Sequence, residues 1–121
     1  MTSTTSTSTD GTGTDGSGKT VVVVAVFTAA PGRLDDLRAA LVEAVPGVHA
    51  EAGCELYALH DAPDDQIYLL EKWGSAADLD AHGDGPAVAR LQQLTAGLTA
   101  GAVSVLRMTP VPAGSPEQGA L

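Results

Sequence analysis

Residues 66–82 have the sequence QIYLLEKWGSAADLDAH, in which the pattern of a strand changes to that of a helix. The first part is apolar and favours a strand, and Ser75 is a residue type that commonly caps the N-terminus of a helix. Because successive strand side chains point to opposite faces, Glu71 and Trp73 are predicted to share one face. His82 follows after one short helix. We therefore expect this segment to form a pocket wall that carries the only tryptophan of the chain.

The rest of the chain extends this alternation, in the order strand, helix, strand, strand, helix, strand. Strands are expected over residues 20–28, 54–61, 66–73 and 102–109, and helical stretches are expected to begin at residues 33 and 75. Pro46 is expected to kink or end the first helix. The second is expected to be interrupted at residues 83–86 and to end at Gly101. This order predicts an α+β, ferredoxin-like βαββαβ fold with a four-stranded antiparallel sheet.

One folded domain, over residues 19–110, is expected between two tails. Residues 1–18 are almost entirely Thr, Ser and Gly and have no apolar side chain after Met1. Such a segment cannot bury enough surface to offset the entropy of ordering, so it is predicted to be disordered. Residues 111–121 are predicted to form a loose C-terminal tail.

The first predicted strand is apolar on both faces, which indicates that both faces of the sheet are covered. Two helices can cover only one face. The other face is expected to pack against the same face of a second copy, which gives an isologous homodimer with sheet packed on sheet, a dimeric α/β barrel.

Composition and charge exclude several kinds of partner. The net charge of −9 disfavours nucleic acids and anionic membranes, because both need clustered Lys and Arg. No apolar run approaches the ~20 residues of a membrane span, and the N-terminal segment lacks the regions of a secretory signal. Cys54 is the only cysteine, so no disulfide can form within the chain. This fits a reducing compartment, and we expect a cytoplasmic protein without a nucleic-acid or membrane partner.

Three short segments resemble the antibiotic-biosynthesis monooxygenase family of dimeric α+β barrels. Residues 51–54, with the sequence EAGC, and Tyr57 are similar to a Glu-Pro-Gly-Cys...Tyr motif, with alanine in the proline position. Residues 71–73 resemble a Glu-x-Trp strand end, and residues 75–82 resemble a helix that carries a histidine. The resemblance spans about residues 20–109, and it rests on the order and spacing of the three segments together.

The resemblance implies chemistry without a cofactor. Members of known activity oxidise electron-rich aromatics such as quinols and polyketide anthrones with molecular oxygen, and they need no metal, flavin or haem. The sequence agrees, because it has no Gly-rich dinucleotide fingerprint and its histidines lack the spacing of metal ligands. We therefore expect no cofactor and no metal, with O2 as co-substrate, a small aromatic substrate and a role in secondary metabolism.

Two departures limit what the resemblance carries over. Many members have a second histidine next to a proline shortly after the first, but here Pro86 is followed by Ala87. Haem-degrading relatives use an asparagine on the first strand and a histidine on the last helix. This chain contains no asparagine, and residues 87–98 contain no histidine, so haem degradation is disfavoured.

A cofactor-free oxygenase must make and hold a substrate anion, and it therefore needs a base, donors for the oxyanion and a dry cavity. His82 is the first candidate for the base, because imidazole titrates near pH ~6.5. Trp73 could stack on a flat substrate and donate its indole N–H. Glu71, if buried, would have a raised pKa and could accept a proton, although a structural hydrogen-bonding role is the simpler interpretation. Trp73 as core and His82 as a helix cap are the corresponding structural alternatives.

Substrate-binding candidates lie on the second and third predicted strands. Tyr57 and Tyr68 offer phenolic donors, and the register decides which of them faces the pocket; Leu69 is the apolar candidate. Strict alternation places Cys54 on the face opposite to Tyr57. Trp73 and His82 are expected to lie at opposite ends of a cavity, because His82 follows Ser75 by about two helical turns, or roughly 10 Å.

Two other functions are compatible with the same sequence. One is a polyketide cyclase or small-molecule isomerase, since such enzymes share this architecture. The other is a non-catalytic, ligand-binding dimeric domain. Fold alone cannot choose among them.

Overall fold

The computed structural model describes residues 19–121, so the tail predicted for residues 1–18 lies outside the described part. The elements follow in the order β1 (Val21–Thr28), α1 (Leu34–His49), β2 (Cys54–Ala62), β3 (Gln66–Trp73), α2 (Ala76–Gly83), α3 (Pro86–Thr95) and β4 (Ser104–Met108). The first three strands agree with the predicted ranges to within one residue, whereas β4 is shorter than predicted.

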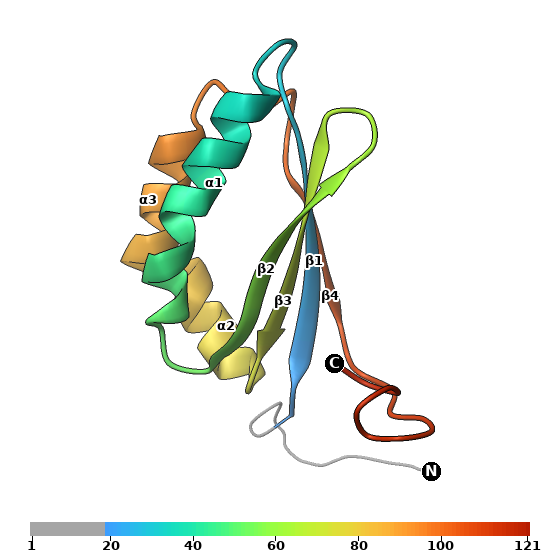
Figure 1. Ribbon diagram of the computed structural model, residues 1–121. Helices are drawn as coiled ribbons and strands as arrows, with labels where there is room; N and C mark the ends of the chain where they lie inside the picture. Colours follow the sequence, from blue (N-terminus) through green and yellow to red (C-terminus); the bar gives the residue numbers. More distant parts are fainter. Residues whose placement is uncertain (1–18) are drawn as a thin grey trace.

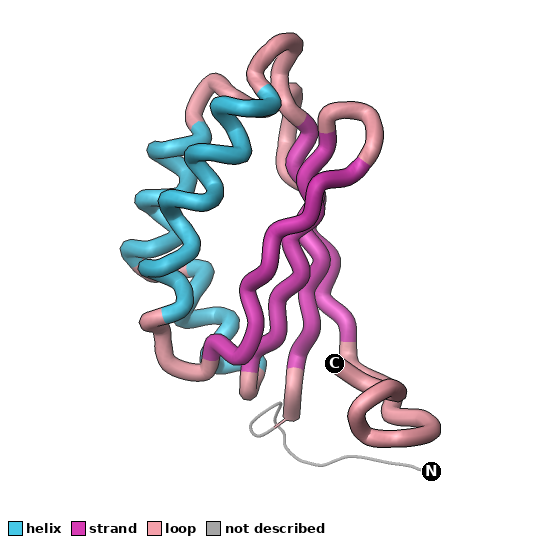
Figure 2. The backbone as a smooth tube through the Cα atoms, in the orientation of Figure 1, coloured by secondary structure: helices cyan, strands magenta, loops and turns pink. Residues whose placement is uncertain are grey.

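The strands form one sheet in the order β2-β3-β1-β4, and all neighbours are antiparallel. The three helices cover one face of this sheet, and none of the described helices lies on the other face (Figures 1 and 2). This arrangement confirms the predicted α+β, ferredoxin-like fold. None of the helices within residues 19–121 is both long and apolar enough to cross a membrane.

The core lies between α1 and the central strands. Leu37, Leu41 and Val48 place their buried side chains on one stripe of α1, as the helical spacing of apolar residues predicts. They face alternate residues of the central strands, among which Val23 and Leu69 are almost fully buried. The sheet therefore presents its alternating apolar residues to the helices and leaves the intervening ones on the open face.

Helix α1 continues through Pro46, whereas the sequence predicted a kink or an end there. Proline removes one backbone donor, which would have bonded to the carbonyl of Val42. Val42 is 57% exposed, so water can reach this side of the helix. The buried stripe on the opposite side, which includes Ala44 and Val48, continues past the proline and holds the last turn on the sheet. Packing therefore outweighs the local cost of the proline.

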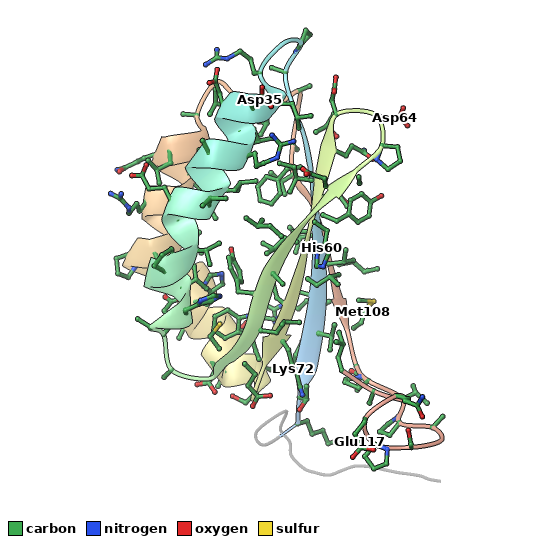
Figure 3. The ribbon with its side chains drawn as sticks, in the orientation of Figure 1. Asp35, His60, Asp64, Lys72, Met108 and Glu117 are labelled. Carbon is green, nitrogen blue, oxygen red and sulfur yellow. The ribbon has the colours of Figure 1, made fainter. Side chains whose placement is uncertain are left out.

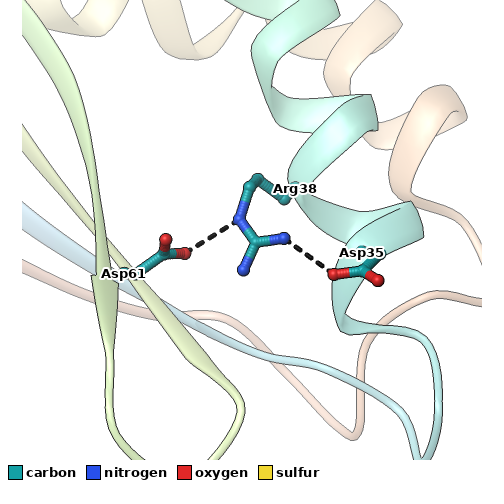
Figure 4. Close-up of polar contacts among 3 residues, drawn as sticks. All are labelled: Asp35, Arg38 and Asp61. Carbon is teal, nitrogen blue, oxygen red and sulfur yellow. Dashed lines mark hydrogen bonds and ion pairs between the residues drawn. The ribbon is translucent and has the colours of Figure 1, made fainter.

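A polar contact joins α1 to β2 at the other end of the helix (Figure 4). Nε of Arg38 lies 2.9 Å from Oδ1 of Asp61, and Nη1 of Arg38 lies 2.9 Å from Oδ1 of Asp35. All three side chains are exposed, so each ion pair contributes little to stability.

Strand β2 contains an irregularity that the sequence pattern did not indicate. Cys54 pairs with Trp73 and Leu56 pairs with Lys72, so Glu55 is an extra residue in the strand. The prediction that Cys54 and Tyr57 lie on opposite faces was therefore wrong, because a bulge between them cancels one step of the alternation. Both pair with residues whose side chains face the helices.

The second helical stretch is divided into α2 and α3 between Gly83 and Pro86, as predicted, but α3 ends at Thr95 rather than at Gly101. Gly97 has a φ of +77°, a left-handed conformation that glycine adopts at little cost and that directs the chain away from the helix. Leu98 remains buried after the turn. Its apolar character therefore reflects burial in a loop and not a further helical turn.

The face of the sheet away from the helices is open and largely apolar. Residues on this face include Val24, Val26, Tyr68, Leu70, Leu106 and Met108. Figure 3 shows Met108 and His60 on this side. The chain after β4 turns back at the end of the sheet where β1 begins (Figure 1), and Val111 and Leu121 lie there with Val22 around a hollow of about 250 Å³. Val22 is covered in this way, while Leu106 remains 56% exposed.

Candidate active site

Strand β3 ends in a buried polar pair. Trp73 is fully buried, and Glu71 is only 5% exposed on the same face, as alternation predicted. The indole N–H of Trp73 donates a hydrogen bond of 2.9 Å to Oε1 of Glu71. Burial raises the pKa of the Glu71 carboxyl, and the hydrogen bond from Trp73 opposes part of that shift. The indole N–H is therefore engaged by the protein itself.

Helix α2 places His82 directly on the indole ring. Ser75 caps the helix, because its Oγ accepts a hydrogen bond of 3.1 Å from the backbone N–H of Asp78. The imidazole of His82 lies against the ring of Trp73, with 4.5 Å between the ring centroids and 33° between the planes. The sequence spacing predicted these residues at opposite ends of a cavity. The predicted separation refers to backbone positions along the helix. The side chains of Trp73 and His82 extend towards each other and their rings are in contact, so no substrate ring fits between them.

Glu51 completes the surroundings of His82 from the loop between α1 and β2. Oε1 of Glu51 lies 2.6 Å from Nδ1 of His82, and the two side chains are 21% and 7% exposed. From the sequence, Glu51 was recognised only as the first residue of the EAGC segment. The contact joins residues 31 positions apart, and no local pattern indicates it. The only available signal was that the resemblance to known motifs begins at Glu51 and ends at His82.

Tyr57 lies beside this group on β2. It pairs with Glu71 across the sheet, and its ring meets that of His82 edge-on, with 5.6 Å between the centroids. The side chain is 5% exposed, and no group within residues 19–121 forms a hydrogen bond with its hydroxyl. Burial, reinforced by the nearby charge of Glu71, raises the pKa of the Tyr57 phenol. The phenol therefore stays protonated at neutral pH and is available as a hydrogen-bond donor.

The remaining substrate-binding candidates lie elsewhere. Leu69 faces the helices but is a core residue, 1% exposed, two positions before Glu71 on β3. Tyr68 is on the open face, where it lines a hollow of about 500 Å³ beside the β2–β3 hairpin together with His60. The structure thus brings together Tyr57, Glu71, Trp73 and His82, together with Glu51, and it separates Tyr68 from them.

We refer to Glu51, Tyr57, Glu71, Trp73 and His82 as the buried cluster. Its groups can transfer a proton and donate a hydrogen bond to an anion, because it combines an imidazole, two carboxyls and a phenol, and all but Glu51 are buried. Cys54 adjoins it, but burial and the charges of Glu51 and Glu71 raise the pKa of its thiol, which disfavours the reactive thiolate. Within the described residues, no three His, Cys, Asp or Glu side chains are grouped to hold a metal ion.

A groove opens next to the buried cluster at the edge of the sheet. It has a volume of about 320 Å³ and follows β2, and it is lined by residues of the bulge and by Tyr57 and His49. The ring of His49 lies 3.1 Å, through Nε2, from the carbonyl oxygen of Tyr57. Tyr57 thus belongs both to the lining of this groove and to the buried cluster.

The sequence matches one known family. The profile of the antibiotic biosynthesis monooxygenase family matches residues 20–94, which is more than half of the chain. No curated protein matches the chain.

Solved structures share the fold. Rv0793 from Mycobacterium tuberculosis is 28% identical with a TM-score of 0.71, over 79% of this chain and 99% of that one. PA3566 from Pseudomonas aeruginosa is 29% identical with a TM-score of 0.70, over 78% of this chain and 97% of that one. A protein from Caulobacter crescentus, whose name assigns it provisionally to antibiotic biosynthesis monooxygenases, is 20% identical with a TM-score of 0.72, over 78% and 92%. At this last identity the likeness concerns the fold alone.

Proposed function

This chain belongs to the antibiotic biosynthesis monooxygenase family, and we propose that it oxidises an electron-rich aromatic, a quinol or a polyketide anthrone, with O2 and without a cofactor. The observation that carries the proposal is the burial of His82 beside Tyr57, with the imidazole on the indole of Trp73. A base and a neutral phenolic donor adjoin each other in a site from which most water is excluded. We place the reaction in secondary metabolism, in keeping with the family.

The proposed reaction begins with loss of a proton. Oxygen in its triplet ground state reacts slowly with closed-shell molecules but accepts an electron from a phenolate or enolate. For an anthrone, the CH2 group becomes a carbonyl. One oxygen atom of O2 enters the product, and the other leaves as water with the two hydrogens. The four electrons that reduce O2 all come from the substrate, so no external reductant is needed.

His82 and Tyr57 have the roles that their surroundings favour. His82 takes the phenolic or enolic proton, and Tyr57 donates a hydrogen bond to the oxyanion that forms. Trp73 holds the imidazole and not the substrate, because it has no exposed surface and its N–H bonds to Glu71. Glu71 in turn fixes the indole. This assignment replaces the expectation that Trp73 stacks on the substrate.

We propose that the substrate approaches along the groove at the edge of β2, because Tyr57 belongs both to this groove and to the buried cluster. The groove volume is at the lower end of the usual range for small-molecule sites. A flat aromatic of two or three rings is the class of substrate that suits it.

We also propose that the protein is a homodimer joined through the open sheet face. Leu106 and Tyr68 on that face are 56% and 37% exposed, although both are large and apolar or aromatic. A contiguous apolar surface of this kind favours association. A second copy, placed with its own open face against the first, would cover both.

Oxygen consumption tests the proposed function. The purified protein, treated with a chelator, should consume one O2 for each anthrone converted to the quinone. With ¹⁸O2, one labelled atom should enter the new carbonyl. Turnover of a polyketide without oxygen would instead indicate a cyclase or isomerase. Stabilisation by an aromatic ligand without any turnover would indicate a binding protein.

A further inference from the structure

We propose that Glu51 is a positioning residue for His82: it holds the imidazole as the tautomer protonated at Nδ1 and leaves Nε2 as the basic nitrogen. The geometry of this pair stands independently of the reaction. Its consequence for turnover rests on the proposed monooxygenase function.

The contact between the two side chains is short and shielded. Oε1 of Glu51 lies 2.6 Å from Nδ1 of His82, which is 7% exposed. A carboxylate can only accept a hydrogen bond, so Nδ1 must carry the proton. In a neutral imidazole the other nitrogen is then the acceptor. Within residues 19–121 no group forms a hydrogen bond with Nε2, so the protein leaves this acceptor unpaired.

The backbone of Glu51 is fixed on both sides of the residue. Its N–H donates to the carbonyl of Val48 at 2.9 Å, and its carbonyl accepts from the N–H of Cys54 at 3.3 Å. The turn is thus held by backbone bonds, and the Glu51 side chain is not needed for it. This separates the side chain's role from that of the loop.

The second carboxylate oxygen lies close to the start of α3. A Cβ added at Gly85 would lie 3.2 Å from Oε2 of Glu51, so glycine leaves the room that the carboxylate occupies. Gly85 caps the N-terminus of α3, a helix of 10 residues, and this end of a helix favours a negative charge. The carboxylate therefore lies between the imidazole of His82 and the N-terminus of α3.

The indole of Trp73 restrains the ring of His82 from another side. Tyr57 meets the ring edge-on, and Glu71 is the other nearby charge. Among residues 19–121, only Glu51 has an atom within hydrogen-bond distance of the imidazole. Ring packing fixes the plane of the imidazole, whereas Glu51 determines which nitrogen carries the proton.

The test is a ¹⁵N NMR spectrum of histidine-labelled protein at pH 8, in which the two tautomers have distinct shifts. The signals are assigned with His49→Gln and His60→Gln variants. In the wild-type protein we expect His82 to be protonated at Nδ1. In Glu51→Leu we expect mainly the Nε2-protonated form, together with a roughly tenfold loss of kcat and little change in KM.

Glu51→Gln separates positioning from charge. It keeps an oxygen acceptor for Nδ1, so we expect the wild-type tautomer and most of the turnover. The control is Glu43→Gln, which changes an exposed glutamate on α1 paired with Arg90 and should leave both readouts unchanged.

A wild-type His82 protonated at Nε2, or a tautomer that stays the same in Glu51→Leu, would overturn the proposal. The wild-type spectrum gives a result even if Glu51→Leu does not fold. If the tautomer changes as expected but neither the wild type nor any variant oxidises an anthrone, the positioning role stands and the monooxygenase function fails.

Discussion

Glu71 illustrates how one buried carboxyl affects the pH dependence of stability. Its pKa is raised on folding, chiefly by burial, so the folded protein binds more protons than the unfolded chain between the ordinary value of about 4.3 and the raised value. The free energy of unfolding therefore falls as pH rises through this interval. Glu71→Gln removes the titration and keeps an oxygen for the Trp73 indole. We expect the Tm of the variant, relative to wild type, to increase from pH 4 to pH 8 in calorimetry.

The matched control is again Glu43→Gln, because Glu43 is exposed and 57% of its side chain is accessible. Its Tm should follow that of the wild type at each pH. A Tm difference for Glu71→Gln that stays constant with pH would contradict the account of Glu71 as a buried, titrating group.

Tyr57 allows catalysis to be separated from packing. Its hydroxyl has no hydrogen-bond partner among residues 19–121, so Tyr57→Phe should change the free energy of unfolding by less than about 0.5 kcal/mol. Loss of a donor to the oxyanion should lower kcat at least tenfold. Tyr68→Phe, on the opposite face, is the matched control and should leave kcat unchanged. If the two variants have equal turnover, the phenol of Tyr57 does not contact the substrate.

Alternation along a strand was sufficient to predict that Glu71 and Trp73 share one face, which the structure shows to be buried. It was insufficient for Glu51, because that contact depends on how the loop after α1 meets the end of α2. The separation predicted for Trp73 and His82 was wrong for a related reason. Sequence spacing gives backbone distances, and large side chains close gaps that the backbone leaves.

At the scale of elements, Gly53 allows the start of β2 to pack closely against α2. Its φ is +81°, and a Cβ added there would collide with the carboxyl group of Asp78. Gly53→Ala should therefore lower the free energy of unfolding by more than the ~1 kcal/mol that the left-handed conformation costs on its own. Gly32→Ala is the matched control, because Gly32 has a φ of +75° with no atom within 4 Å of an added Cβ. Denaturant unfolding measures the free energy of unfolding of both variants. Equal decreases in the two would show that the collision with Asp78 does not contribute to the effect of Gly53→Ala.

Helix α1 offers a prediction in the opposite direction. Pro46→Ala restores a backbone donor for the carbonyl of Val42 within a helix that is already continuous. The restored hydrogen bond stabilises the folded state, whereas alanine makes the unfolded chain more flexible and so favours unfolding. We expect the first effect to be larger and the free energy of unfolding to rise by about 1 kcal/mol or more. Chemical denaturation measures this free energy. A decrease in the variant would mean that the helix needs Pro46 for its native conformation.

The elements themselves could be predicted largely from the sequence, because strand and helix periods differ and turn residues mark their ends. The exceptions have tertiary causes. The helix passes Pro46 because the buried side of α1 continues beyond it, and β2 gains a bulge at Glu55 that alternation cannot indicate.

At the scale of the whole molecule, the open sheet face leads to a prediction about assembly. Sedimentation at micromolar concentration should give about twice the mass of one chain. Leu106→Asp should produce monomers, because it places a charge on the proposed interface. Val42→Asp is the matched control, since Val42 is equally exposed (57% against 56%) but lies on α1. A stable, well-folded wild-type monomer would contradict the proposed dimer.

The central claim is oxidation by O2 with His82 as the base, and the most direct test is O2 uptake by wild type and His82→Ala with an anthrone. We predict stoichiometric O2 consumption by the wild type and a kcat about 10²-fold lower for the variant. The difference should shrink as pH rises and the substrate ionises by itself, and thermal melting should confirm that the variant is folded. Oxidation by a folded His82→Ala at the wild-type rate across this pH range would contradict the account.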